Sequence, residues 1–81
     1  MIRVLEIATE DGNIVYKVQF DDHKGQLHEL VVSIPVARWS EELAKERIME
    51  AVERERARLV LEEARALEGA ELELEFEEVG S

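Results

Sequence analysis

The 81-residue sequence contains no cysteine, so disulfides are excluded and the redox compartment is unconstrained. There is one proline, and aromatic residues make up 5% of the chain against 46% apolar residues, which predicts a core of mainly aliphatic side chains. No apolar run is long enough to cross a bilayer, and no signal-peptide pattern follows Met1. We therefore expect a cytoplasmic protein without a membrane partner.

Basic residues are also scarce, because 20 acidic residues face only 10 basic ones and the net charge is −10. The imbalance is greatest in residues 69–81, which hold glutamates and no basic residue. Such a field repels phosphate groups and anionic lipids, which argues against binding to nucleic acid or membranes. A basic protein surface remains a possible partner, and so does mimicry of nucleic acid, although a solvated surface that aids solubility is the commoner reason for such charge.

Motifs for catalysis or cofactor binding are lacking. Asp21, Asp22, His23 and His28 are the only cluster of metal-capable side chains, but their spacing matches no known site. We expect His28 to lie at the far end of a strand from those ligands. Ser33 has no histidine–carboxylate pair placed to activate it, and there is no glycine-rich phosphate loop. The sequence therefore predicts a non-enzymatic protein without catalytic, metal-binding or cofactor-binding residues.

Residues 14–21 alternate between apolar and polar side chains, as a half-buried β-strand does, and residues 26–34 place Leu30, Val32 and Ile34 on one face. The predicted strands are Ile2–Thr9, Ile14–Asp21 and Gln26–Ile34. Asp11-Gly12 favours a tight hairpin turn between the first two strands, and Gly25 can take a positive φ in the second turn. We therefore expect a three-stranded antiparallel meander.

The first strand carries apolar residues on both faces. Ile2 and Val4 favour one face, while Leu5 and Ile7 favour the other. Such a pattern is typical either of a central strand covered on both sides or of a strand whose phase is switched by a bulge.

The largest predicted element is a helix over residues 40–68. Ser40 is a good N-cap, Glu41 and Glu42 suit the positive end of the helix dipole, and no glycine or proline interrupts the run. Gly69 is placed to end it in a left-handed conformation.

The apolar stripe of this helix changes direction along its length. In the second half, Leu59, Val60 and Leu67 point about a third of a turn away from the apolar face of the first half. At about 1.5 Å per residue the helix measures about 43 Å, whereas a nine-residue strand spans about 30 Å. Either the helix bends near Arg54–Arg58 within one subunit, or its end overhangs the sheet and these three residues contact a second copy, which we favour.

Residues 70–79 alternate again, with Leu72, Leu74 and Phe76 on one side and glutamates on the other. The prediction is a single α+β domain, 1–81, of order β-β-β-α-β, in which one long helix covers one face of a four-stranded mixed sheet. If the first strand is central, a right-handed crossover gives the strand order 4-1-2-3. Pairing of the last strand beside the third is the alternative.

Three local features favour the same fold: a capped helix, an Asp-Gly hairpin and strands with glutamate at exposed positions. They occur in the runs EDGNIVYKV and SEELAKERIMEAVERERARLVLEEARALEGAELELEFEEV. In this the chain resembles computationally designed small α/β proteins. The resemblance is one of style over most of the chain and is not a family motif. It implies a thermostable structural scaffold without a natural substrate, found only as a recombinant product.

The functional expectation is accordingly a non-enzymatic scaffold that forms a homo-oligomer. The alternative is a natural acidic interaction module of a thermophile or its phage, since such proteins also favour glutamate and arginine.

Overall fold

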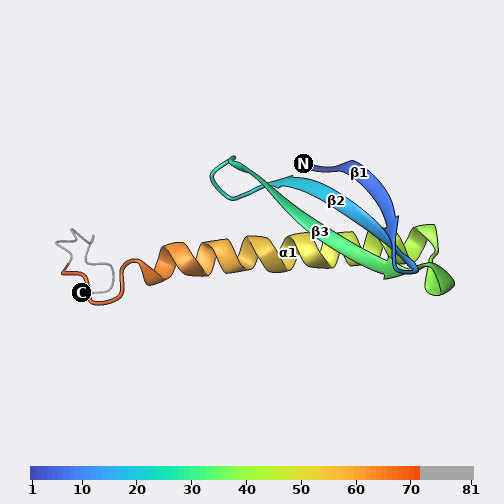
Figure 1. Cartoon of the computed structure of the whole chain (residues 1–81). Helices are drawn as coiled ribbons and strands as arrows, with labels where there is room; N and C mark the ends of the chain where they lie inside the picture. The colour runs from blue at the N-terminus through green and yellow to red at the C-terminus, as the bar shows by residue number, and fades with distance from the viewer. Residues whose placement is uncertain (72–81) are drawn as a thin grey trace.

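The computed structural model describes residues 1–71 and has an α+β fold, with one helix against a three-stranded antiparallel sheet of order β1-β2-β3 (Figure 1). The elements are β1 (Ile2–Glu10), β2 (Asn13–Asp21), β3 (Leu27–Pro35), the 3₁₀ turn η1 (Val36–Arg38) and α1 (Glu41–Arg65). The molecule is elongated, measuring 59 × 23 × 20 Å. The antiparallel meander followed by one long helix is thus confirmed.

Both hairpin turns form where the sequence predicts them. Asp11 (φ 48°) and Gly12 (φ 76°) both have left-handed backbones, as the tightest hairpin turn requires. In the second turn Gly25 has φ 81°, and one carboxylate oxygen of Asp22 accepts bonds from the amides of Lys24 and Gln26, each 2.8 Å long. These local bonds fix the register of the meander.

The core lies between α1 and the β2–β3 half of the sheet. The alternate residues of β3 from His28 to Ile34 lie opposite those of β2 from Phe20 to Ile14, so they share one face, as predicted. The buried core residues are Tyr16, Val18, Phe20, Val32, Ile34, Ala44, Ile48 and Val52. No residue of β1 is among them.

β1 contains a bulge, and it lies at an edge of the described sheet. The pairing register shifts between Val4 and Glu6. As a result Val4 lies opposite Val18 and Ile7 opposite Tyr16, so Val4 and Ile7 share the helix-side face. The bulge interpretation is therefore correct, whereas the assignment of Ile7 to the other face is wrong. Among the strands that the structure describes, β2 and not β1 is central.

α1 is one continuous helix with no bend at Arg54–Arg58, and its C-terminal part projects beyond the sheet (Figure 1). The Ser40 hydroxyl accepts a 3.0 Å bond from the amide of Leu43, which confirms the N-cap. The helix ends at Arg65, three residues before the predicted end. Residues 66–68 instead donate to carbonyls three residues back and form a turn that closes at Gly69 (φ 77°).

The predicted strand over residues 70–79 lies outside the described residues, apart from its first two positions. The amide of Ala70 donates to the carbonyl of Leu67 (3.0 Å) and belongs to the turn after α1. The order 4-1-2-3 therefore stays a prediction. Within residues 1–71, no helix combines the length and the apolar character needed to cross a membrane.

Candidate interaction surface

Arg56 fixes the position of α1 against the sheet. Its guanidinium donates to the carbonyl of Asp21 (2.8 Å) and to the Asp21 carboxylate (2.7 Å). The same carboxylate oxygen accepts a 2.8 Å bond from the ammonium group of Met1. The start of β1, the end of β2 and one flank of α1 therefore meet at Arg56.

Beyond Arg56, the three predicted self-association residues do not share one environment. Leu59 is partly buried and packs against the core. Val60 is 45% exposed and Leu67 is 57% exposed. Val60 lies one turn after Arg56, so it lies on the flank of α1 that faces the start of β1. Leu67 belongs to the turn that follows α1. Leu59 is better described as the edge of the core than as part of an interface.

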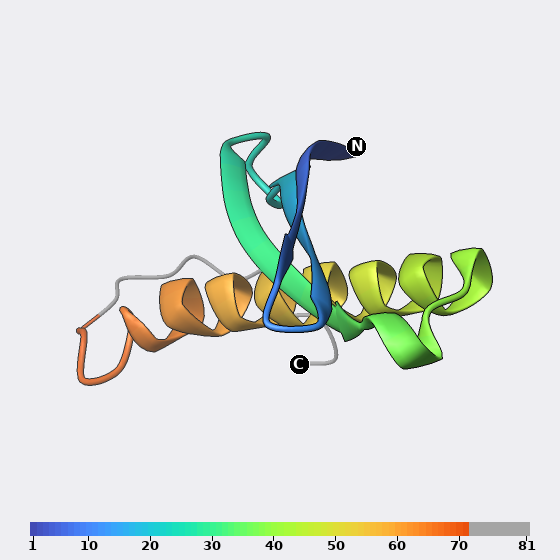
Figure 2. The same ribbon diagram turned by 45° about the vertical axis from the view of Figure 1, so that its right-hand side comes forward.

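Two further groups of exposed apolar side chains lie on the same side of the molecule. Met49, eleven residues before Val60, shares its flank of α1 and is 48% exposed. On β1, Val4 and Ile7 face the helix side but extend past its cover, with exposures of 43% and 62%. Figure 2 shows how the strands cross α1, so that the helix runs on beyond the sheet. We name Val4, Ile7, Met49, Val60 and Leu67 the uncovered apolar surface.

Three members of this surface were not predicted from the sequence. Val4 and Ile7 were obscured by the bulge, although the change of phase at Leu5 was the signal that could have revealed it. Met49 directly follows the buried Ile48 in the sequence, and only its spacing of eleven residues to Val60 links it to the distal half of α1.

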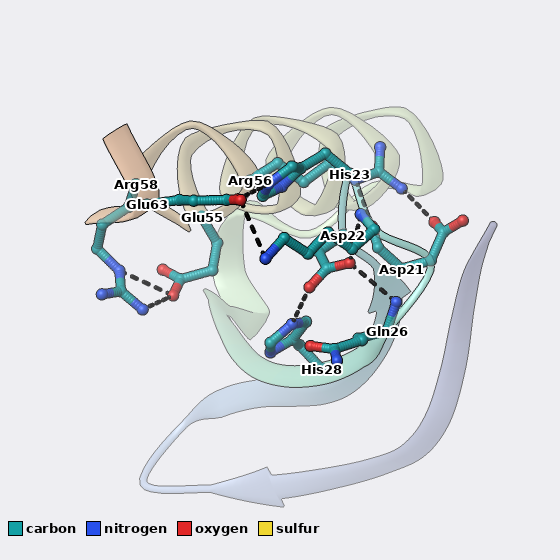
Figure 3. A network of polar contacts seen from close by, with 10 residues as sticks. Asp21, Asp22, His23, Gln26, His28, Glu55, Arg56, Arg58 and Glu63 are labelled. Carbon is teal, nitrogen blue, oxygen red and sulfur yellow. Dashed lines mark hydrogen bonds and ion pairs between the residues drawn. The ribbon is translucent and has the colours of Figure 1, made fainter. Parts of the chain in front are cut away.

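A polar network ties the second turn to the distal half of α1 (Figure 3). His23 and Lys24 both contact the Glu63 carboxylate, the lysine at 3.0 Å. His28 Nε2 lies 2.7 Å from Asp22 Oδ2, and its ring stacks on Phe20 with 5.6 Å between the centroids. The expectation that His28 lies far from Asp22 is therefore wrong.

The histidines and carboxylates form separate pairs and not a shared site. Asp22, His23, His28 and Glu63 border a hollow of about 370 Å³. His28 pairs with Asp22 and His23 with Glu63, and within residues 1–71 no three such side chains are arranged to hold a metal ion. Ser33 lies on the opposite face of β3 from His28. The arrangement thus serves to hold the turn against the helix.

The ion pairs lower the pKa values of the carboxylates in this network. The hydrogen bond from His28, with the amides of Gln26 and Lys24, lowers the pKa of Asp22 to about 2. His23, followed by Lys24, lowers the pKa of Glu63. The Asp22 side chain is only 6% exposed, so its bonds are well shielded from water.

The Asp22 bonds predict a specific acid sensitivity. Because the folded-state pKa is about 2 and the ordinary value is 3.8, the stabilisation is complete above the ordinary value and is lost as the pH falls toward 2. Asp22→Asn should lower the urea midpoint at neutral pH and flatten its pH dependence in this acid range. Asp11→Asn, in the other turn, is the control and should leave the acid slope unchanged. If the urea midpoint of Asp22→Asn changed with acid pH as steeply as that of the unmodified chain, the Asp22 bonds would not be the source of the acid sensitivity.

No protein-family model matches this sequence, and comparison with curated proteins and with solved structures finds no match.

Proposed function

We propose that this chain is a non-enzymatic structural scaffold whose function is to associate with itself, in keeping with the designed style of its sequence. The observation that supports the proposal best is the uncovered apolar surface. It combines the free face of an edge strand with the flank of a straight, overhanging helix. An apolar patch of this kind on a water-exposed chain marks an interaction site.

A two-fold pair of copies is the simplest assembly that buries this surface. In a two-fold interface the same patch serves both partners, so each apolar residue contributes twice. The overhanging end of α1 in one copy then covers the half of the sheet that its partner's own helix leaves open. Oligomers of higher order fit the same surface only if a second patch takes part.

The predicted fourth strand fits the same picture. We propose that it lies beside β1, in the order 4-1-2-3. A strand in this place would pair the open edge of β1 and would set its leucines and phenylalanine against Val4 and Ile7.

Light scattering of the unmodified chain and of a Val60→Glu, Leu67→Glu variant tests the proposal. We expect a mass near twice 9.3 kDa for the unmodified chain and near 9.3 kDa for the variant. The matched control is Ser33→Glu, Ala37→Glu, which adds the same two charges at exposed positions away from the uncovered apolar surface and should remain a dimer. Equal monomer masses for all three proteins would end the proposal.

Salt separates this proposal from the alternative of an acidic module that binds a basic protein surface or mimics nucleic acid. Two copies of net charge −10 repel each other, so self-association should tighten as salt rises to about 1 M, where the screening length is about 3 Å. A complex with a basic protein should weaken under the same change. A dimer whose dissociation constant rises as salt is added would contradict apolar self-association.

A further inference from the structure

We infer that the outer edge of β3, on the side away from β2, binds an extended acidic segment of a partner protein as an added strand. The flank of α1 beside this edge supplies the charge that selects the partner. This surface lies at the other edge of the sheet and on the other flank of α1 from the uncovered apolar surface. The inference therefore goes beyond self-association and does not depend on it.

The outer edge of β3 presents backbone groups that no other described strand uses. The amide of Asp22 donates to the carbonyl of Gln26 (2.8 Å) at one end of the β2–β3 pair. The amide of Val36 donates to the carbonyl of Gly12 (2.9 Å) at the other end. Hydrogen-bonded pairs alternate along an antiparallel ladder, so the even-numbered residues of β3 bond to β2 and the odd-numbered ones turn their backbone groups outward. Because β3 is an edge among the described strands, these groups can pair with a further strand.

A hollow of about 220 Å³ lies between this edge and α1. It is bordered by residues 31–33 of β3 and by residues of α1 that include Arg47, Glu50 and Arg54. Every second side chain of an added strand would point toward the helix layer and into this hollow, and the others would lie beside the exposed Val31 on the open face. Since two arginines border the hollow against one glutamate, its charge favours carboxylates on the helix side of the added strand.

The two arginines belong to a longer row on the same flank of α1. Its members are spaced by seven, four and seven residues, so they lie within about 40° of one another around the helix: Arg47, Arg54, Arg58 and Arg65. Four of the 10 basic residues thus share one flank, although the net charge of the chain is −10. Within residues 1–71, only Arg58 of the four forms ion pairs, with Glu55 and Glu62. The others present guanidinium groups, which bind carboxylates through two parallel hydrogen bonds.

This combination of features favours an acidic peptide over a second copy or a nucleic acid. Two β3 edges that paired about a two-fold axis would bring two arginine rows side by side, where like charges repel. A nucleic acid offers acceptors but no alternating backbone donors, and the net charge of −10 repels it. An extended segment in which glutamates alternate with apolar residues supplies both the backbone pairing and the carboxylates.

Fluorescence anisotropy of a labelled peptide with the full chain tests the inference. The probe has nine residues, the length of β3, alternates valine with glutamate and is blocked at both ends. We expect it to bind at least about tenfold more tightly than a matched peptide that alternates valine with lysine. Absence of binding by the glutamate peptide would overturn the inference.

Charge reversal on α1 tests the arginine row. Arg47→Glu, Arg54→Glu should raise the dissociation constant of the glutamate peptide at least about tenfold, because two attractive contacts become repulsive. The matched control is Arg38→Glu, Lys45→Glu, which makes the same change of charge at exposed positions outside the row. The control should stay within about threefold of the unmodified chain, since solvent and salt screen distant charges. Equal losses in the two variants would contradict a site at the row.

Two N-methylated forms of the glutamate peptide test the backbone pairing. In an extended strand, the N–H groups of the glutamates point to one edge and those of the valines to the other. Only one of the two forms, methylated at the glutamates or at the valines, should therefore lose binding. Equal dissociation constants for the two forms would rule out strand addition.

The other occupants of this edge are outcomes of the same experiments. A single-stranded oligonucleotide of thymidines that binds as tightly as the glutamate peptide, and is weakened by the same arginine variant, would replace the inference with a polyanion site. A change in the light-scattering mass of Arg47→Glu, Arg54→Glu would show that a second copy covers the edge, which also overturns the inference. The test of the uncovered apolar surface with Val60→Glu, Leu67→Glu is decided separately, because those residues lie outside this edge and row.

Discussion

We expect Phe20→Ala to lower the free energy of unfolding of this chain more than any surface substitution does. The side chain is fully buried, stacks on the His28 ring and lies 5.9 Å from the Arg56 guanidinium carbon. Truncating a buried phenylalanine costs about 3–5 kcal/mol, from lost burial and from the cavity left behind. A chain of this size has roughly 4–12 kcal/mol of total stability. One substitution thus removes a large share of it.

Urea denaturation followed by circular dichroism measures this effect. The matched control is Val31→Ala, on the open face of β3 with a 66% exposed side chain, which should cost less than about 1 kcal/mol. A loss below about 1 kcal/mol in Phe20→Ala would mean that the core does not lie between β2, β3 and α1.

Val4→Lys, Ile7→Lys should abolish association and leave the fold of the subunit intact. Both side chains are already exposed in the single chain, so the lysines add little cost there. In the dimer each would place an unpaired ammonium group in an apolar contact, twice over by symmetry. If the two lysines reduce the free energy of dimerisation by about 3 kcal/mol or more, the dissociation constant of the dimer rises at least about a hundredfold.

The control for this variant uses the same strand. Glu6→Lys, Ala8→Lys places two lysines on the other face of β1, where no helix-side contact is changed. Sedimentation equilibrium of the two variants gives the comparison. A hundredfold loss in the Val4, Ile7 variant alone supports the surface, and equal dimer constants in the two variants would disprove it.

Local rules predicted most of the described fold from the sequence. The Asp11-Gly12 turn, the Ser40 cap and the alternation along β2 and β3 each depend on a few neighbouring residues, and each is confirmed. Two features escaped these rules. The bulge near Leu5 changes the face of Ile7 only through pairing with β2, and the early end of α1 at Arg65 depends on which carbonyls the following amides reach.

Spacing along the helix accounts for only some of the ion pairs. The helix pairs Glu41 with Lys45 and Arg58 with Glu62 form as spacing suggests, but Glu50 and Arg54, also four apart, form no ion pair. The contact of His23 with Glu63 joins residues forty apart in sequence. No local pattern could have revealed it, because it depends on how the second turn lies along α1.

Self-association through Leu59, Val60 and Leu67 stays a prediction, and the structure describes only how exposed these side chains are. Val60 and Leu67 are exposed as expected, whereas Leu59, next to Val60 in sequence, turns toward the core. The direction of a helical side chain rotates by about 100° per residue, so neighbours in sequence need not share a contact. The β1 members of the surface required the register, which only the paired strands supply.

The most direct test of self-association is an isotope-filtered nuclear Overhauser experiment on a mixture of labelled and unlabelled copies. It detects only contacts between different molecules. We expect cross-peaks from the methyl groups of Val4, Ile7, Val60 and Leu67 to protons of the other copy, and none from the core methyl groups of Val18 and Val52. An absence of intermolecular cross-peaks from the first group would contradict the account.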